Sequence, residues 1–144
     1  MEFKAFKLDP RVEAGVAAAG FVTPTPIQTK AIPSVMNGRD IMGLAQTGTG
    51  KTAVFALPIL HRLMQGKRGH VRSMIIAPTR ELAEQIHDAI NSLGKETRMR
   101  SVTIYGGVNI NTQIQKLKRA QRLLLPAPVG SLTTWAVERS ISAG

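Results

Sequence analysis

The feature that most constrains this chain is a glycine-rich segment, Ala45–Thr52, which reads AQTGTGKT. Gly48 and Gly50 permit backbone conformations in which successive N–H groups point inward at one anion. In a phosphate-binding loop the lysine neutralises the outer phosphates and the hydroxyl that follows it ligates Mg²⁺. Lys51 and Thr52 occupy those two positions here. The segment therefore predicts a loop that binds a phosphate chain.

The flanks of this segment favour the same interpretation. A short apolar run, residues 40–45, precedes it, and an apolar stretch from Ala53 to Leu63, interrupted at Pro58, follows it. A strand before the loop and a helix after it are the context that phosphate binding requires, because the helix directs its positive end at the phosphates. The alternative is a glycine-rich turn with a chance lysine, and the flanks argue against it.

Further along the chain, short apolar runs alternate with stretches that have helical periodicity. The runs Met74–Ala77 and Val102–Tyr105 predict buried parallel strands. Each precedes a predicted helix, and the first of these helices can be capped by Thr79. Strands that alternate with helices predict an α/β fold with a parallel sheet flanked by helices. The apolar faces of the two helices comprise Leu82, Ile86, Ala89, Ile90 and Leu93, and Ile110, Ile114 and Leu117.

Two helices are predicted before the glycine-rich segment. One begins at Asp9-Pro10, with aspartate as N-cap and proline at the first helical position, and ends at Gly20. The other begins at Thr25-Pro26 and ends near Asn37-Gly38. Pro33 is expected to end or bend this second helix early.

The charge of the chain favours polyanionic partners. There are 19 Lys and Arg against 9 Asp and Glu, a net charge of +10, which points to nucleic acid first. A soluble surface that happens to be basic is the alternative. No cysteine is present, which fits a reducing cytosol, and no apolar run approaches the roughly 20 residues of a membrane span. The basic residues gather at Lys67, Arg68 and Arg72, at Lys95, Arg98 and Arg100, and at Lys116, Lys118, Arg119 and Arg122.

The stretch Gly20–Gln28, GFVTPTPIQ, resembles the Q motif of DEAD-box RNA helicases, and Phe3 lies upstream of it where that family places an isolated aromatic. The resemblance implies that Gln28 reads the edge of adenine and that Phe3 stacks on its ring. A glutamine amide offers a donor and an acceptor together, as adenine does. For Phe3 the alternative is a core or frayed terminal aromatic, and Phe6 and Phe21 are interpreted as packing residues.

Three more segments resemble motifs of the same family. AQTGTGKT is the DEAD-box form of motif I, Pro78–Ala83 (PTRELA) resembles motif Ia, and Gly106-Gly107 resembles the GG doublet. The last two line the RNA side of the lobe in that family, which implies sequence-independent contacts to the RNA backbone. A helix cap at Thr79 and a plain turn at the glycine doublet are equally open. The implied RNA contacts are Pro78, Thr79, Arg80, Gly106 and Gly107.

The resemblance implies an incomplete RecA-like P-loop NTPase that uses ATP and Mg²⁺, binds single-stranded or duplex RNA, and belongs to a cytoplasmic RNA-unwinding enzyme. A small-acceptor kinase fits less well, because it needs neither the Q motif nor PTRELA. An inactive nucleotide- or RNA-binding fragment and an inert product of a truncated gene are also compatible with the sequence. No membrane partner is expected, and the oligomeric state is open. The implied nucleotide contacts are Phe3, Gln28, Gln46, Thr47, Gly48, Thr49, Gly50, Lys51 and Thr52, with Thr52 also on Mg²⁺.

The resemblance covers residues 3–119, so residues 1–120 are interpreted as a partial helicase ATP-binding domain and 121–144 as an irregular, non-homologous tail. The family's Asp-Glu-Ala-Asp box and second lobe are not found, and hydrolysis by this chain alone is not expected. We hypothesise that the tail is a frameshifted reading, because permitted codons for residues 121–135 also encode EIVVACPGRLLDHL in another frame. Exposed strand edges and apolar helix faces, with poor solubility, are expected.

Overall fold

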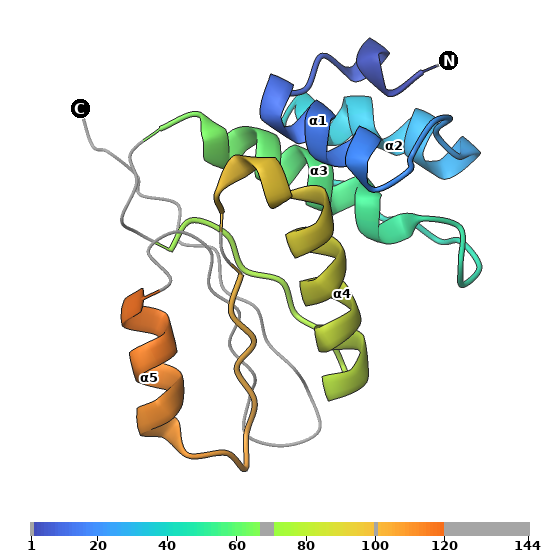
Figure 1. Cartoon of the computed structure of the whole chain (residues 1–144). Helices are drawn as coiled ribbons and strands as arrows, with labels where there is room; N and C mark the ends of the chain where they lie inside the picture. Colours follow the sequence, from blue (N-terminus) through green and yellow to red (C-terminus); the bar gives the residue numbers. More distant parts are fainter. Residues whose placement is uncertain (1, 67–70, 100, 120–144) are drawn as a thin grey trace. The chain divides into compact units, whose positions relative to one another are not determined.

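The computed structural model of the chain describes residues 2–66, 71–99 and 101–119 (Figure 1). The described residues fall into two compact units, one within Met1–Gln65 and Ser92–Arg98, the other within Gly66–Asn91 and Met99–Gly144. Each unit is described by itself below. The predicted irregular tail and its frameshift origin lie outside the described residues. So do Lys67, Arg68, Arg100 and Arg122 of the basic clusters, and the side chains of Leu117, Lys118 and Arg119.

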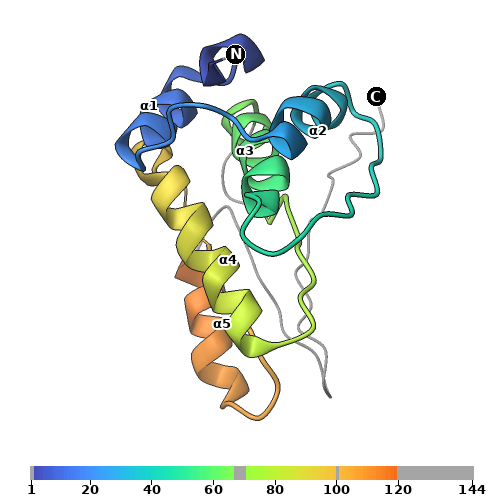
Figure 2. The ribbon, with the colours of Figure 1, turned by 90° about the vertical axis from the view of Figure 1, so that its right-hand side faces the viewer.

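The first unit is built from helices. They are the 3-10 turn η1 (Phe3–Phe6), α1 (Pro10–Ala18), α2 (Pro26–Met36), α3 (Lys51–Met64) and the 3-10 turn η2 (Lys95–Thr97). α2 and α3 pack side by side, as both views show (Figures 1 and 2). α1 contacts η1, α3 and η2. The side chains of Val12, Ile32, Leu57 and Leu60 are completely buried at the centre of these contacts.

The predicted helix boundaries in this unit are confirmed. The Asp9 carboxylate accepts a hydrogen bond of 3.0 Å from the backbone N–H of Arg11, which caps α1. Gly20, with φ of +77°, follows the C-cap of the same helix. Thr25 is the N-cap of α2, and Gly38, with φ of +81°, follows its C-cap. Local capping chemistry therefore fixes where these helices begin and end.

Neither proline ends its helix, so the predicted interruption at Pro58 and the predicted early end at Pro33 are wrong. α2 continues through Pro33 to Met36, and α3 continues through Pro58 to Met64. A proline inside a helix costs about 3 kcal/mol because a hydrogen bond is lost and the ring clashes with the preceding turn. Both prolines adjoin completely buried residues, Ile32 in α2 and Leu57 in α3. Packing of these faces outweighs the local cost, as tertiary context commonly outweighs propensity.

The second unit contains α4 (Arg80–Leu93) up to Asn91 and α5 (Ile110–Arg119). The predicted cap of α4 is confirmed, because the Leu82 N–H donates to Thr79 Oγ1 at 3.2 Å. The structure assigns no strand among the described residues, only a single bridge residue at Ala77. A strand is defined by pairing with a neighbour. Without a described partner, the apolar runs 40–45, 74–77 and 102–105 do not confirm the predicted sheet.

Several apolar side chains are exposed, as expected from the sequence. Met42 and Leu44 before the glycine-rich segment are 91% and 89% exposed. Ile76 is 61% exposed, and Ile110 on α5 is 59% exposed. Such groups on a surface favour association with other apolar surfaces. Among the residues that the structure describes, no helix has the length and apolar character needed to cross a bilayer.

Candidate nucleotide pocket and nucleic-acid surface

The glycine-rich segment forms a tight loop that leads directly into α3. Gly48 and Gly50 have φ of +79° and +80°, and Gly50 is the N-cap of the helix. The Thr49 hydroxyl donates to the Gln46 carbonyl at 2.8 Å. The Lys51 ammonium donates to the carbonyls of Ala45 and Gln46, the latter at 3.1 Å, so its charge lies inside the loop.

The remaining predicted loop residues follow the same course. Gln46, Thr47 and Gly48 are exposed, whereas Thr49 and Gly50 are half-buried. Thr52 is half-buried in the first turn of α3. The first backbone N–H groups of a helix have no partner within it and carry partial positive charge. The loop and helix start are therefore suited to bind phosphate.

The amide of Gln28 ties α2 to this loop. Gln28 is 1% exposed, its Oε1 accepts from the Thr25 N–H at 2.9 Å, and its Nε2 donates to the Gly50 carbonyl at 3.1 Å. The Thr25 hydroxyl donates to the Thr49 carbonyl at 2.9 Å. A Cβ atom on Gly50 would lie 2.3 Å from Gln28 Nε2. The structure thus brings together the Q-motif glutamine and the phosphate loop, which the sequence separates.

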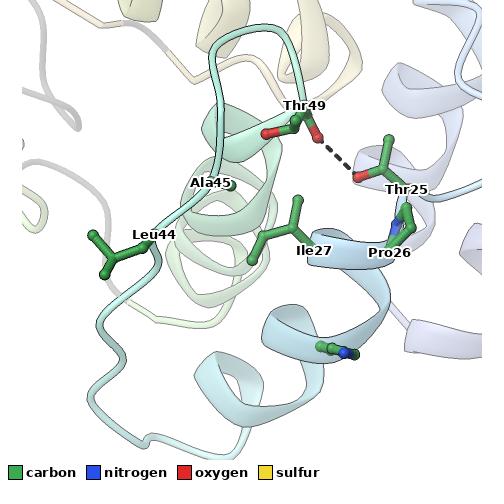
Figure 3. Close-up of a pocket in the computed structure, with 7 residues that line it drawn as sticks. Thr25, Pro26, Ile27, Leu44, Ala45 and Thr49 are labelled. Carbon is green, nitrogen blue, oxygen red and sulfur yellow. Dashed lines mark hydrogen bonds between the residues drawn. The ribbon is translucent and has the colours of Figure 1, made fainter.

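A pocket of about 420 Å³ lies between the start of α2 and the segment that enters the loop (Figure 3). The hydrogen bond between Thr25 and Thr49 closes one side of it, and Ile27 and Ala45 contribute apolar walls. Of the predicted nucleotide contacts, only Thr49 lines this pocket. The residues that line it are Thr25, Pro26, Ile27, Lys30, Leu44, Ala45 and Thr49.

Phe3 lies in a cluster of three phenylalanines. Its ring is 5% exposed and packs edge to face on Phe6 and Phe21, with centroid distances of 5.8 and 5.9 Å. This arrangement confirms the packing interpretation of Phe6 and Phe21. It also places Phe3 as a core aromatic, so the stacking of Phe3 on adenine stays a prediction.

In the second unit, Arg80 and the glycine doublet lie together. One Nη atom of Arg80 donates to the Gly106 carbonyl at 2.6 Å, and its guanidinium lies 4.8 Å from the centre of the Tyr105 ring. Gly107 follows in the turn with φ of +76°. An arginine close to an aromatic ring gains a cation–π attraction. The two segments with predicted RNA contacts therefore form one exposed surface.

The two remaining predicted RNA contacts, Pro78 and Thr79, are both exposed, but only Thr79 has a second role as a helix cap. Thr79 is exposed, but its hydroxyl accepts from the Leu82 N–H and caps α4, in agreement with its interpretation as a helix cap. Pro78 is exposed beside it. The exposed guanidinium of Arg80 is consequently the main charged group of this surface.

Comparison with known sequences identifies the family of the chain. The sequence profile of the family described as "DEAD/DEAH box helicase" matches residues 25–137. The chain belongs to the DEAD/DEAH box helicase family. The match extends beyond residue 120 into the tail.

Individual members of the DEAD/DEAH box family are similar over most of the chain. The DEAD-box ATP-dependent RNA helicase RhpA of Helicobacter pylori is 46% identical over 127 residues, which are 88% of this chain and 25% of that protein. The ATP-dependent RNA helicase CshA of Listeria monocytogenes is 42% identical over 88% of this chain and 24% of its own length. The chain thus spans about a quarter of the length of these relatives.

A solved member of the DEAD/DEAH box family has the same fold. The crystal structure of a DEAD box protein from the hyperthermophile Methanococcus jannaschii is 36% identical, with a TM-score of 0.79. The comparison covers 89% of this chain and 35% of that one. The chain therefore shares the fold of this part of a DEAD box protein.

Sequence reasoning misses three residues of this DEAD/DEAH box chain that the structure places at the sites. The sequence indicates Thr25 only as a helix cap and Tyr105 only as a strand residue. Nothing in the motifs points to Gln113, although it is 4% exposed and bonds to the Tyr105 backbone. A signal is present, because Gln113 interrupts the apolar face formed by Ile110 and Ile114. A polar residue on an apolar helix face needs a partner.

Proposed function

We propose that this chain is the ATP-binding and RNA-backbone-binding part of the first lobe of an ATP-dependent RNA helicase. The observation that carries the proposal is the hydrogen bond of 3.1 Å between Gln28 Nε2 and the Gly50 carbonyl. It places an amide able to read a base beside a loop able to bind phosphate. Membership of the DEAD/DEAH box family supports the pairing.

Adenine would be read by the hydrogen-bonding groups that remain on Gln28. An amide has two N–H donors and two acceptor lone pairs, and the contacts to Thr25 and Gly50 use one of each. The remaining donor and acceptor match the edge of adenine. Guanine does not match this pattern, because it presents two acceptors at the same edge and no donor. Stacking by Phe3 would require its ring to leave the phenylalanine cluster.

The phosphate chain would be held by Gly48–Lys51 backbone N–H groups and by the Lys51 ammonium. Lys51 already lies inside the loop, bonded to the carbonyls of Ala45 and Gln46, and would exchange them for phosphate oxygens. Among the described residues, no group of three or more histidine, aspartate or glutamate side chains is placed to hold a metal. Thr52, in the first turn of α3, fits the single hydroxyl ligand that Mg²⁺ takes beside phosphate oxygens. Bound there, Mg²⁺ would neutralise charge on the phosphates.

The RNA backbone would be bound by Arg80 with the Gly106-Gly107 turn, and by Pro78 and Thr79 beside them. Arg80 is exposed and presents several N–H donors. The net charge of +10 supports attraction to a polyanion. No base-reading group is proposed here, so binding is expected to be independent of sequence.

The apolar runs 40–45, 74–77 and 102–105 are proposed to be parallel strands of a RecA-like sheet. The fold shared with the DEAD box protein of Methanococcus jannaschii supports this. A cytoplasmic location is proposed from the absence of cysteine in the sequence.

A second candidate is a nucleotide- and RNA-binding fragment without hydrolysis. The observation that favours it is that the residues lining the pocket beside the loop include no aspartate or glutamate that could position an attacking water. Nucleotide binding without phosphate release in the presence of RNA would support this candidate.

The proposal is tested by titrating the chain with a fluorescent adenine nucleotide. Lys51→Ala is expected to weaken binding about 100-fold, because a charge-assisted contact to phosphate is lost. An exposed lysine of η2, changed in Lys95→Ala, is the control and should leave the affinity unchanged. Competition with the guanine nucleotide should be weak for the wild type. Equal competition by guanine, or unchanged binding by Lys51→Ala, would refute the nucleotide site.

A further inference from the structure

We propose that Tyr105 and Gln113 are positioning residues that hold Arg80 ready for an RNA phosphate. The inference rests on the proposed function, because it assigns the ligand of Arg80 to the RNA backbone. It adds two residues that no motif of the sequence identifies. The three side chains come from α4, from the segment before the glycine turn and from α5, all within the second unit.

The first step is the hydrogen bonding of the Gln113 amide to the backbone of Tyr105 and Val108. Its Oε1 accepts from the Tyr105 N–H at 2.9 Å, and its Nε2 donates to the carbonyls of Tyr105 and Val108 at 3.1 and 3.3 Å. A neighbouring strand would supply the same pair of bonds to one residue. Because Gln113 is 4% exposed, water cannot readily replace it. The amide therefore fixes the backbone on both sides of the Gly106-Gly107 turn.

The second step is the contact of the Arg80 guanidinium with Tyr105 and Gly106. The Tyr105 ring lies 4.8 Å from the guanidinium carbon, and the Gly106 carbonyl accepts from one Nη atom at 2.6 Å. The bond to Gly106 uses one of the five guanidinium N–H donors, which leaves donors for a phosphate. A long side chain held in its binding geometry loses less freedom when the ligand arrives. Binding is thereby strengthened without a new contact to RNA.

A merely structural role for Tyr105 is the competing explanation, and a spectroscopic probe separates the two. Tyr105 is the only tyrosine of the chain, so 3-fluorotyrosine gives a single ¹⁹F resonance from its ring. Arg80→Ala should shift this resonance, and Gln113→Leu should shift or broaden it. Arg39→Ala, an exposed arginine of the other unit, and Gln115→Leu, an exposed glutamine of α5, are the matched controls and should leave it in place. An unmoved resonance in Arg80→Ala overturns the inference.

The second measurement is binding of labelled oligouridylate to the same chain, followed by fluorescence anisotropy. Tyr105→Leu should weaken binding about three-fold, the size of an exposed cation–π contact, and Tyr105→Phe should restore it. In the Arg80→Ala background Tyr105→Leu should have no further effect. Additive losses, or a loss in Tyr105→Phe equal to that in Tyr105→Leu, overturn the inference.

The two proposals fail in different ways. A wild-type chain whose ¹⁹F resonance responds to Arg80→Ala but which does not bind oligouridylate at low salt refutes the proposed RNA site. In that case the ligand assigned to Arg80 is wrong, while the contacts among Gln113, Tyr105 and Arg80 stand. RNA binding with no ¹⁹F response refutes the positioning role and leaves the RNA site intact.

Discussion

The two units of this chain build their candidate sites in opposite ways. In the first, Gln28 is 1% exposed and bonds directly to the glycine-rich loop, so the proposed site is part of the packed interior. In the second, Arg80 is exposed. Its guanidinium contacts the Tyr105 ring and donates a hydrogen bond to the Gly106 carbonyl. A substitution at the first site should therefore change stability and ligand binding together. A substitution of the exposed Arg80 at the second should change ligand binding alone.

The largest effect is expected for Gly50→Ala, which tests the first half of this comparison. Alanine would have to adopt φ of +80°, and its Cβ would lie 2.3 Å from Gln28 Nε2. The two penalties together should lower the free energy of unfolding by about 3 kcal/mol. Urea unfolding measures this loss, and titration with a fluorescent adenine nucleotide should show at least about a 100-fold weaker affinity.

The control for this prediction is Gly20→Ala. Gly20 also has positive φ, +77°, but nothing lies within 4 Å of an added Cβ. It should lose only about 1–2 kcal/mol, the cost of the left-handed backbone, and retain nucleotide affinity. If Gly50→Ala behaved like Gly20→Ala in both measurements, the coupling of Gln28 to the loop would not exist.

The next largest effect is expected for Gly15→Ala. It tests whether the first unit is also tightly packed in a region outside its proposed site. A Cβ on Gly15 of α1 would lie 1.9 Å from the Leu93 carbonyl oxygen, so the backbones must separate. Alanine is favoured over glycine in a helix by about 1 kcal/mol, but the clash should outweigh this and leave a net loss of about 2 kcal/mol. Thermal unfolding followed by circular dichroism measures the change.

An exposed position of the same helix supplies the comparison for Gly15. Ala17→Gly should lose about 1 kcal/mol through helix propensity alone. A stabilised Gly15→Ala variant would mean that α1 does not approach Leu93 closely, and the description of the first unit as tightly packed would be wrong.

Arg80→Ala tests the second half of the comparison. The loss of one charge-assisted contact should weaken binding of oligouridylate about ten-fold. The free energy of unfolding should change by less than about 0.5 kcal/mol, because the side chain is exposed. Anisotropy and urea unfolding of the same sample measure the two quantities. A large loss of stability would show that this surface is as deeply built into its unit as the Gln28 site.

The same contrast explains what can be predicted from the sequence. Asp9, Thr25 and Gly20 act on their own helices, so the sequence alone locates the ends of α1 and the start of α2. The phosphate loop is equally local. The predicted early end at Pro33 and the predicted interruption at Pro58 are wrong because burial of neighbouring residues, which is a tertiary effect, keeps both helices continuous.

Contacts between distant residues cannot be predicted in the same way. Gln28 bonds to Gly50, and Gln113 bonds to Tyr105, only because the chain folds back on itself. No local sequence pattern predicts either contact. The resemblance to a family supplies the role of Gln28, but nothing comparable points to Gln113. The predicted strands depend on pairing across the chain, which the described residues do not include.

The smallest effect is expected at Asp9, which belongs to neither proposed site. Asp9 caps α1 and pairs with Arg11 at 3.1 Å, and the hydrogen bond from Arg11 lowers the pKa of the Asp9 carboxyl below its ordinary value of 3.8. Asp9→Ala should lose about 1 kcal/mol at neutral pH, whereas Asp9→Asn keeps a capping oxygen and should lose only a few tenths. Urea unfolding at pH 7 measures both.

The pH dependence of this small effect identifies its origin. Because the pKa of Asp9 is lower in the folded than in the unfolded chain, its ionised form contributes stability above pH 3.8, and that contribution is lost as the pH falls through the lowered pKa. The difference between the wild type and Asp9→Asn should therefore disappear under strongly acidic conditions. A difference that persists there would assign the effect to the shape of the cap rather than to the charge. Nucleotide and RNA affinities should be the same for both variants, since the Asp9 side chain caps α1 and belongs to neither proposed site.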